Sequence, residues 1–195
     1  MNRKYYIAAA VAGAGLLLDQ AVKGWMQAHL SPDGMMTLVP DLVTLHYTRN
    51  PGIAFSLIPE LPVAVRVPLF GAITLAAAAI IIHLLRLTPA AAVRAPMGLG
   101  LVLAGALGNQ VDRFHYTYVV DYLLISRYWP IFNLADACIT AGIALLILDL
   151  LFAPRPEEPE GTGKKACPTV LLGAAEPEAA SATGNAPGDG PEVVG

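Results

Sequence analysis

Apolar residues run through the first 153 residues in four long stretches, each bounded by polar or charged positions. A helix crosses the hydrocarbon core of a bilayer with about 20 mostly apolar residues. The pattern therefore predicts an all-α integral membrane protein with four transmembrane helices, at about residues 5–25, 61–85, 97–112 and 134–152. The third stretch is purely apolar only from Met97 to Gly108, so its polar end must reach the interface or face a wet cavity.

The segment between the first two helices has a different pattern. Leu42–Tyr47 is rich in β-branched and aromatic residues, and Asn50-Pro51-Gly52 is a turn signal, so we expect a small extracytoplasmic β element. Residues 154–195 are rich in Pro, Gly, Ala and Glu and carry seven acidic but only three basic side chains. They offer too little apolar surface to offset the entropy of ordering. Residues 1–153 are thus predicted to form the membrane domain and 154–195 a disordered cytoplasmic tail.

Lysine and arginine positions orient the predicted helices. The predicted helices place seven basic residues on one side of the membrane: Arg3, Lys4, Arg86, Arg94, Arg155, Lys164 and Lys165. The other side receives Arg49, Arg66, Arg113 and Arg127. Because cytoplasmic loops carry the excess of Lys and Arg, we expect both termini to be cytoplasmic.

Composition narrows the class of protein further. Hydrophobic residues make up 55% of the chain and charged residues 14%, against about 25% charged in a soluble domain. The absence of a long basic stripe argues against a nucleic-acid partner. Two cysteines and four scattered histidines show no ligand spacing, so neither a disulfide nor a metal site is expected.

Ionisable residues in the apolar stretches need a physical reason, because a charge at mid-bilayer costs at least about 2.5–3.5 kcal/mol. Asp19 and Lys23 stand four apart on one helix face. They form either a self-neutralising pair at the outer interface or a polar wall facing the bundle interior. Asn109 and Asp112 share a face at the end of the third stretch, and Arg113 follows them.

Two more asparagines stand in positions of interest. Asn50 lies in the turn, where it is either a plain loop residue or a hydrogen-bonding group for a substrate backbone. Asn133 is a good N-cap for the fourth helix, and Asp136, three residues later, suits the positive end of the helix dipole. Taken alone, Asp136 is equally well explained as a residue that starts the helix.

Asp121 and Asp136 together suggest chemistry that neither suggests alone. One follows the third helix and the other opens the fourth, on the same membrane face, so the two carboxyl groups can meet if these elements are neighbours. Two close carboxyl groups share a proton, so one can deprotonate a water while the other protonates a leaving group. Ser56 and Ser126 lack an evident base, and Cys138 lacks a basic neighbour, so no rival nucleophile stands out.

Five sequence blocks, in order, complete the pattern: DQAVK, RNPGIAFS, GALGNQVDR, VVDY and FNLAD. Together they resemble the motifs of the bacterial lipoprotein signal peptidases (signal peptidase II), and the resemblance covers about residues 5–153. It implies that Asp121 and Asp136 are the catalytic aspartates of an intramembrane aspartic endopeptidase. It also implies site-supporting or substrate-binding roles for Asp19, Lys23, Asn50, Gly52, Asn109, Asp112, Arg113 and Asn133.

The resemblance implies a substrate and a location as well. The substrate is a prolipoprotein whose cysteine carries a diacylglyceryl group, and the cut falls just before that cysteine. The implied location is the bacterial cytoplasmic (inner) membrane, with the active site toward the extracytoplasmic face. Membrane lipids are the other implied partners, and neither a metal nor an organic cofactor is implied.

The match has departures that bear on the site. Tyr122 stands where Phe or another apolar residue is expected, and the segment between Asp121 and Asp136 is short. We interpret the aromatic stretch Tyr116–Trp129 as a lid. Because Asp136 stands at a helix N-terminus, we expect it to hold the negative charge while Asp121 holds the proton.

Two other functions fit part of the pattern. Intramembrane Asp, Asn and Lys residues also mark the ion paths of small transporters, although no inverted repeat is visible here. In a non-enzymatic membrane assembly factor, the same acids would serve only as helix caps and interface pairs.

Overall fold

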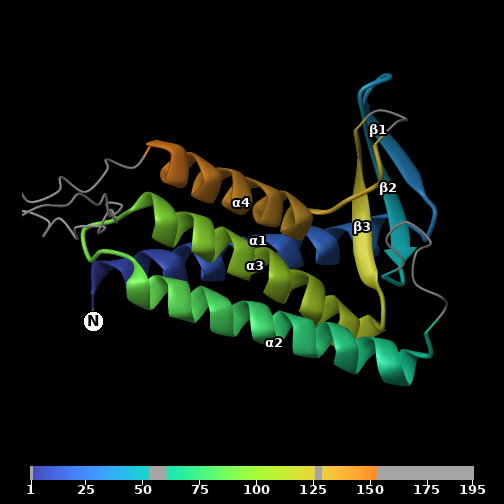
Figure 1. Cartoon of the computed structure of the whole chain (residues 1–195). Coiled ribbons are helices and arrows are strands. Elements are labelled where there is room, and N and C mark those ends of the chain that lie inside the picture. Colours follow the sequence, from blue (N-terminus) through green and yellow to red (C-terminus); the bar gives the residue numbers. More distant parts are fainter. Residues whose placement is uncertain (1, 53–60, 126–128, 153–195) are drawn as a thin grey trace, which may run out of the picture. The chain divides into compact units, whose positions relative to one another are not determined.

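The computed structural model describes residues 2–52, 61–125 and 129–152. The tail at 154–195 lies outside these residues, so its disorder stays a prediction. The described chain forms helices and one small sheet, which stands across one end of the helices (Figure 1).

Four helices follow one another along the described residues: α1 Arg3–His29, α2 Val63–Leu87, α3 Arg94–Tyr116 and α4 Leu134–Phe152. Three of them, α1, α2 and α4, are long and apolar enough to cross a membrane. The chain is therefore a mostly helical, multi-pass membrane protein. The bounds of α4 are as predicted, whereas α1 and α3 run further at both ends, because the polar residues that end their apolar stretches remain helical.

α3 is the central helix, and it packs against α1, α2 and α4. Its polar end is covered by these neighbours, which explains why α3 is less apolar than a lipid-facing span. Gly105 of α3 lies where a Cβ would collide with the carbonyl oxygen of Ala135 in α4. Glycine at this position thus allows α3 and the start of α4 to approach closely.

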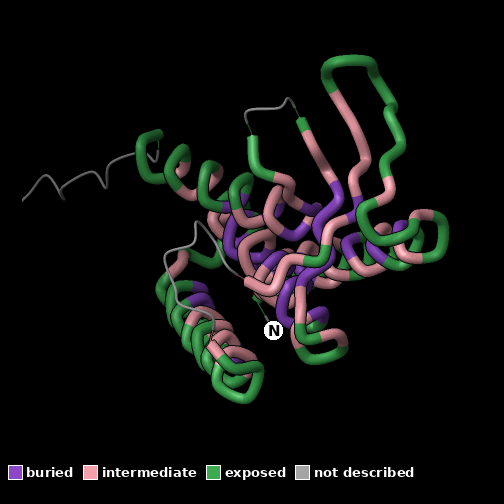
Figure 2. Tube along the Cα trace, turned by 90° about the vertical axis from the view of Figure 1, so that its right-hand side faces the viewer, coloured by how far each residue is buried: buried purple, intermediate pink, exposed green. Residues whose placement is uncertain are grey.

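The sheet contains three antiparallel strands in the order β1–β2–β3: Met35–Val39, Val43–Asn50 and Val119–Ile125. The small β element expected around Leu42–Tyr47 is therefore present. The hairpin of β1 and β2 projects away from the helices, with β1 exposed and β2 mostly half-buried, while Tyr47 of β2 and Val119–Tyr122 of β3 are buried (Figure 2). Pairing of Asn50 with Val119 and of Thr48 with Asp121 brings the turn at Asn50 beside β3.

Strand β3 contradicts one prediction made from the sequence, the aromatic lid. Residues Val119–Ile125 were expected within an aromatic lid, yet they form a strand hydrogen-bonded along β2. The first four of these residues are buried. The lid interpretation therefore does not hold for β3, and residues 126–128 fall outside the described chain.

Two apolar clusters form the core. One lies between α1, α2 and α3 and contains Ala8, Ile81, Leu85 and Leu99. The other joins α1 to the sheet and contains Met26, Tyr47, Val120 and Tyr122. The second cluster fixes β3 against the helices, at the end where the polar side chains gather.

Candidate active site

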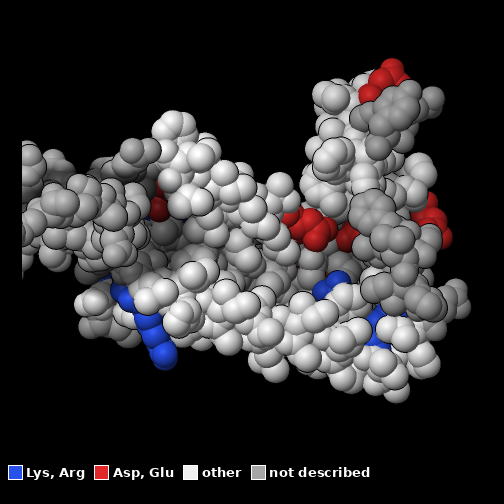
Figure 3. All heavy atoms as spheres, in the orientation of Figure 1, with Lys and Arg blue, Asp and Glu red and all other residues white. Residues whose placement is uncertain are grey.

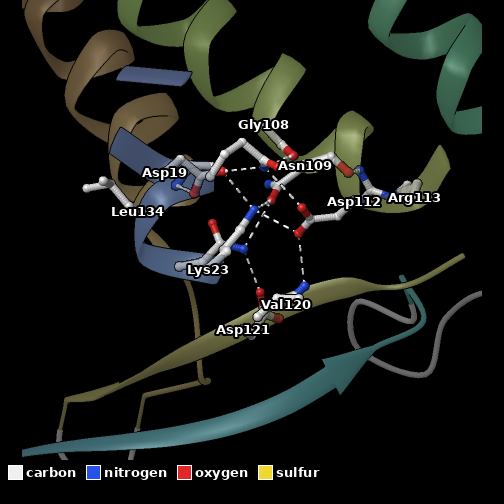
Figure 4. A network of polar contacts seen from close by, with 12 residues as sticks. Asp19, Lys23, Gly108, Asn109, Asp112, Arg113, Val120, Asp121 and Leu134 are labelled. Atoms are coloured by element: carbon white, nitrogen blue, oxygen red, sulfur yellow. Dashed lines mark hydrogen bonds and ion pairs between the residues drawn. The ribbon is translucent and has the colours of Figure 1, made fainter. Parts of the chain in front are cut away.

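Polar side chains from five elements meet where the helices reach the sheet (Figure 4). They come from α1, β2, α3, β3 and the start of α4. Six of the predicted site residues are buried here: Asp19, Lys23, Asn109, Asp112, Asp121 and Asn133. The sequence-predicted site is thus one connected cluster.

Lys23 is the centre of a buried ion triad. Its Nζ lies 2.9 Å from Asp19 Oδ2 and 2.9 Å from Asp112 Oδ2, and only 1% of Lys23 is exposed. Of the two alternatives for Asp19 and Lys23, the structure shows the interior polar wall. Gly108 makes room for this wall, because a Cβ there would lie 2.5 Å from Asp19 Oδ2.

Gln20 is a member of the cluster that the sequence analysis missed. Its Nε2 donates to Asp112 Oδ1 at 3.1 Å and to the Gly108 carbonyl at 3.2 Å. The sequence could have indicated this role, because a glutamine next to Asp19 in an apolar helix needs a hydrogen-bond partner when it is buried.

Three asparagine side chains have orientations fixed by groups that can only donate. Asn50 Oδ1 accepts the Gly52 N–H at 2.8 Å. Asn109 Oδ1 accepts from Lys23 Nζ at 3.1 Å, and Asn133 Oδ1 accepts the Asp136 N–H at 3.0 Å. The NH₂ group of each asparagine must therefore point the other way.

Each of those NH₂ groups meets a carboxylate. Asn50 donates to Asp121 Oδ2 at 2.7 Å, and Asn109 donates to Asp136 Oδ1 at 2.8 Å. Asn133 donates to Asp121 Oδ1 at 2.6 Å, while its backbone N–H donates to Asp136 Oδ2 at 3.2 Å. Asn133 thus bridges the two carboxylates, and every carboxylate oxygen of Asp121 and Asp136 receives an N–H.

The surroundings of Asp121 favour its protonated form. Burial raises the pKa of Asp121 to about 6, the Asn50 hydrogen bond opposes that rise, and the nearby Asp136 charge adds to it. Asp136 is only partly buried. Asp121 can therefore hold a proton up to a pH of about 6, well above the range of an ordinary aspartate, as a carboxyl group that donates a proton in acid–base chemistry must.

Arg113 and Gly52 meet at Phe70, a residue of α2 that the sequence analysis did not single out. The Arg113 guanidinium lies 4.2 Å from the Phe70 ring centroid, and its Nη1 donates to the Asn109 carbonyl at 3.2 Å. Gly52 has a φ of +91°, and a Cβ there would lie 2.9 Å from the Phe70 ring. The turn after Asn50 therefore needs glycine, both for its backbone and for its contact with α2.

An open groove of about 650 Å³ begins at Asp136 and follows one face of α4. Its other lining residues are Ile125, Trp129, Phe132, Ala137, Thr140, Ala141 and Ala144. Figure 3 shows acidic atoms at the surface in the notch between the helices and the sheet. Asp136 is thus reached from a mainly apolar surface, while Asp121 is buried beside it. Among the described residues, no group of three or more His, Cys, Asp or Glu could hold a metal ion.

These features define a multi-pass membrane protein with a buried carboxylate site that opens onto an apolar groove. A family model described as Signal peptidase (SPase) II matches residues 11–152, and the chain belongs to that family. It is therefore a peptidase of the signal peptidase II type.

Curated relatives agree with this assignment. The lipoprotein signal peptidase of Syntrophus aciditrophicus (strain SB) is 35% identical over 154 residues, which cover 77% of this chain and 96% of the relative. That of Pelotomaculum thermopropionicum is 40% identical over 140 residues, covering 70% of this chain and 86% of the relative.

Solved structures share the fold. A bacterial membrane enzyme determined by the in meso method at 1.9 Å resolution is 26% identical, with a TM-score of 0.68, and the match covers 79% of this chain and 99% of that one. A second, at 2.3 Å resolution, is 24% identical with a TM-score of 0.70, covers 83% and 99% respectively, and supports the fold alone.

Proposed function

We propose that this peptidase uses Asp121 and Asp136 as its catalytic pair and removes signal peptides from diacylglyceryl-modified prolipoproteins, cutting just before the lipidated cysteine. The observation that carries the proposal is the double bridge through Asn133, which joins Asp121 to Asp136, and Asp136 lines an apolar groove. Both relatives are lipoprotein signal peptidases, which agrees with the substrate class.

The proposed reaction needs no group beyond the two carboxyls and a water. Asp136 takes a proton from the water while the water oxygen bonds to the scissile carbonyl carbon. Asp121 gives its proton to the carbonyl oxygen. The tetrahedral intermediate then returns a hydroxyl proton to Asp121, and Asp136 gives its proton to the leaving nitrogen as the C–N bond breaks. The pair ends as it began, and the products are a carboxylic acid and the free amine of the cysteine.

The groove suits the lipid part of the substrate. It starts at Asp136, and Ala137, Thr140, Ala141 and Ala144 place small side chains along the helix. An acyl chain attached to the cysteine can lie in it while the peptide bond reaches the carboxylates. An acyl chain held there positions the peptide bond for reaction, and an unlipidated substrate lacks this positioning.

The proposed topology has four spans, with both termini in the cytoplasm and the sheet and site on the extracytoplasmic side of the inner membrane. Lys4 Nζ donates to the carbonyls of Arg86 and Thr88, at 3.1 Å and 2.5 Å, so the basic start of α1 adjoins the basic end of α2. The sheet, whose strand β3 contains Asp121, stands at the other end of these helices (Figure 1). This separation fits a basic cytoplasmic end and a catalytic outer end.

The test is cleavage of a diacylglyceryl-modified prolipoprotein by the purified protein and by its Asp121→Asn and Asp136→Asn variants. Each variant is expected to lose activity by at least about a thousandfold, because removal of one member of a unit disables the unit. Unlipidated substrate should remain uncut.

Asp149→Asn is the matched control, since Asp149 lies near the far end of α4 from Asp136. That variant should cleave at the unmodified rate. Substantial cleavage by either Asp121→Asn or Asp136→Asn would disprove the proposed pair.

A further inference from the structure

The first turn of α4, which carries Asp136, has a hydrogen-bond partner for each of its leading N–H groups. A helix begins with N–H groups that have no acceptor within the helix. Leu134 N donates to the Tyr122 hydroxyl at 3.2 Å, and Ala135 N donates to Asp19 Oδ1 at 2.9 Å. The Asp136 N–H is accepted by the N-cap Asn133. The start of α4 is therefore fixed from outside by β3 and by α1.

Hydrogen bonds join neighbouring residues of β3, Asp121–Leu123, to the residues at and just before the start of α4, Phe132–Leu134. Asp121 accepts from the Asn133 side chain. The Tyr122 and Leu123 N–H groups donate to the Phe132 carbonyl at 3.1 Å and 2.7 Å, and the Phe132 N–H donates back to Leu123 at 3.1 Å. The Tyr122 hydroxyl extends this series of bonds to Leu134, two residues closer to Asp136 than the backbone bonds to Phe132 reach.

Only the hydroxyl distinguishes Tyr122 from a packing residue. Tyr122 is 5% exposed and belongs to the cluster of Met26, Tyr47 and Val120, against which Leu134 packs. A phenylalanine would fill the same space. Burial raises the pKa of Tyr122 above its ordinary value, so the hydroxyl stays neutral and can accept the N–H over the working range of pH.

We propose that Tyr122 is a positioning residue whose hydroxyl fixes the first turn of α4 against β3 and so sets the separation of Asp121 and Asp136. This inference rests on the proposed catalytic pair. The two carboxyls lie on different elements, so their separation is only as constant as the contact between β3 and α4. Misplacement of reacting groups by about 1 Å can cost on the order of a hundredfold in rate.

The first test is Tyr122→Phe, assayed with lipidated substrate across pH. We expect kcat to fall about tenfold, since the turn loses one restraint of several, while KM changes by less than about twofold. The alkaline limb of the pH profile should move to higher pH, because a looser turn weakens the Asn133 bond that favours ionised Asp121. Tyr118→Phe is the matched control, because it removes the hydroxyl of the tyrosine that directly precedes β3. It should leave kcat and the pH profile unchanged.

A second variant removes the other partner. Leu134→Pro deletes the donated N–H at the first helical position, where proline is well tolerated, and leaves the Tyr122 hydroxyl in place. If the hydrogen bond acts as proposed, the double variant Tyr122→Phe/Leu134→Pro should lose less kcat than the product of the two single losses.

The outcomes separate this inference from the proposed function. In one outcome, Asp121→Asn and Asp136→Asn are inactive, but Tyr122→Phe keeps its kcat and pH profile. That result would overturn the role of Tyr122 and leave the catalytic pair in place. A lower melting temperature of Tyr122→Phe with unchanged kcat would do the same, because it assigns the hydroxyl to folding only. Active aspartate variants would overturn the pair, and this inference with it.

Discussion

Three asparagines determine how the two carboxylates are presented, and the sequence could identify the residues but not this arrangement. Asp121, Asp136, Asn109 and Asn133 could be selected because polar side chains beside apolar stretches are costly. The direction of each side-chain amide could not, because it depends on donors remote in the chain, such as Lys23 for Asn109. Asn50 shows the difference: a substrate contact was considered for it, and the structure bonds its NH₂ to Asp121.

The raised pKa of Asp121 predicts the pH dependence of cleavage. If Asp121 must donate a proton, kcat/KM should fall as the pH rises past about 6, where Asp121 loses that proton. The Asn50 hydrogen bond favours the ionised form. Asn50→Ala should therefore raise the pKa further and shift the alkaline limb to higher pH, as measured by kcat/KM in buffered nanodiscs.

Gln27→Ala is the control for this shift, because Gln27 is an amide of α1 with no bond to either carboxylate among those described. Its profile should match that of the unmodified protein. A limb that stays in place or moves to lower pH in Asn50→Ala would contradict the assignment.

At the scale of elements, the predictions succeeded where the local pattern was sufficient and failed where pairing was remote. The start of α4 at Leu134 could be predicted because Asn133 is an N-cap that the structure uses. β3 was missed because Val119–Ile125 buries residues on both faces and pairs with a strand about 70 residues earlier, so it lacks a clean alternation. The ends of α1 and α3 were placed too early because polarity was taken as the end of the helix, whereas Gln27, His29, Arg113 and His115 remain helical while exposed or only partly buried.

Lys4 predicts the stability of the contact between α1 and α2. Its buried ammonium binds the last carbonyls of α2, where a positive charge also complements the helix dipole. Lys4→Met should lower the free energy of unfolding by about 1–3 kcal/mol, seen as a lower melting temperature in detergent, with cleavage per folded molecule unchanged.

Arg3→Met removes the same charge from the neighbouring exposed position, so it controls for effects on insertion. It should leave the melting temperature unchanged. Equal losses in the two variants would show that charge alone, and not the two hydrogen bonds, is responsible.

At the scale of the molecule, the distribution of polar groups is one-sided. Within the described ranges, the buried charged side chains gather beside β3 (Figure 4), except Lys4, which binds the end of α2. Between these two places lies the apolar cluster around Leu99. A transporter needs polar groups or water along its path, so this distribution favours chemistry at one membrane face and agrees with the peptidase family.

The family match predicts which part of the chain is sufficient for activity. It ends at residue 152, and residues 154–195 have the composition of a disordered segment. A protein ending at Ala153 should cleave lipidated substrate within about twofold of the full chain. A loss beyond tenfold, with an unchanged melting temperature, would assign the tail a part in catalysis.

The bridge between Leu123 and Phe132 has a consequence for how such an enzyme can diversify. It closes the base of the segment that joins the two aspartates, so the geometry of the pair does not depend on the length of chain between the bridged residues. We expect insertions, deletions or exchanges there to leave the chemistry unchanged. Grafting a longer segment between Leu123 and Phe132 would test whether this part of the chain selects which lipoproteins are accepted.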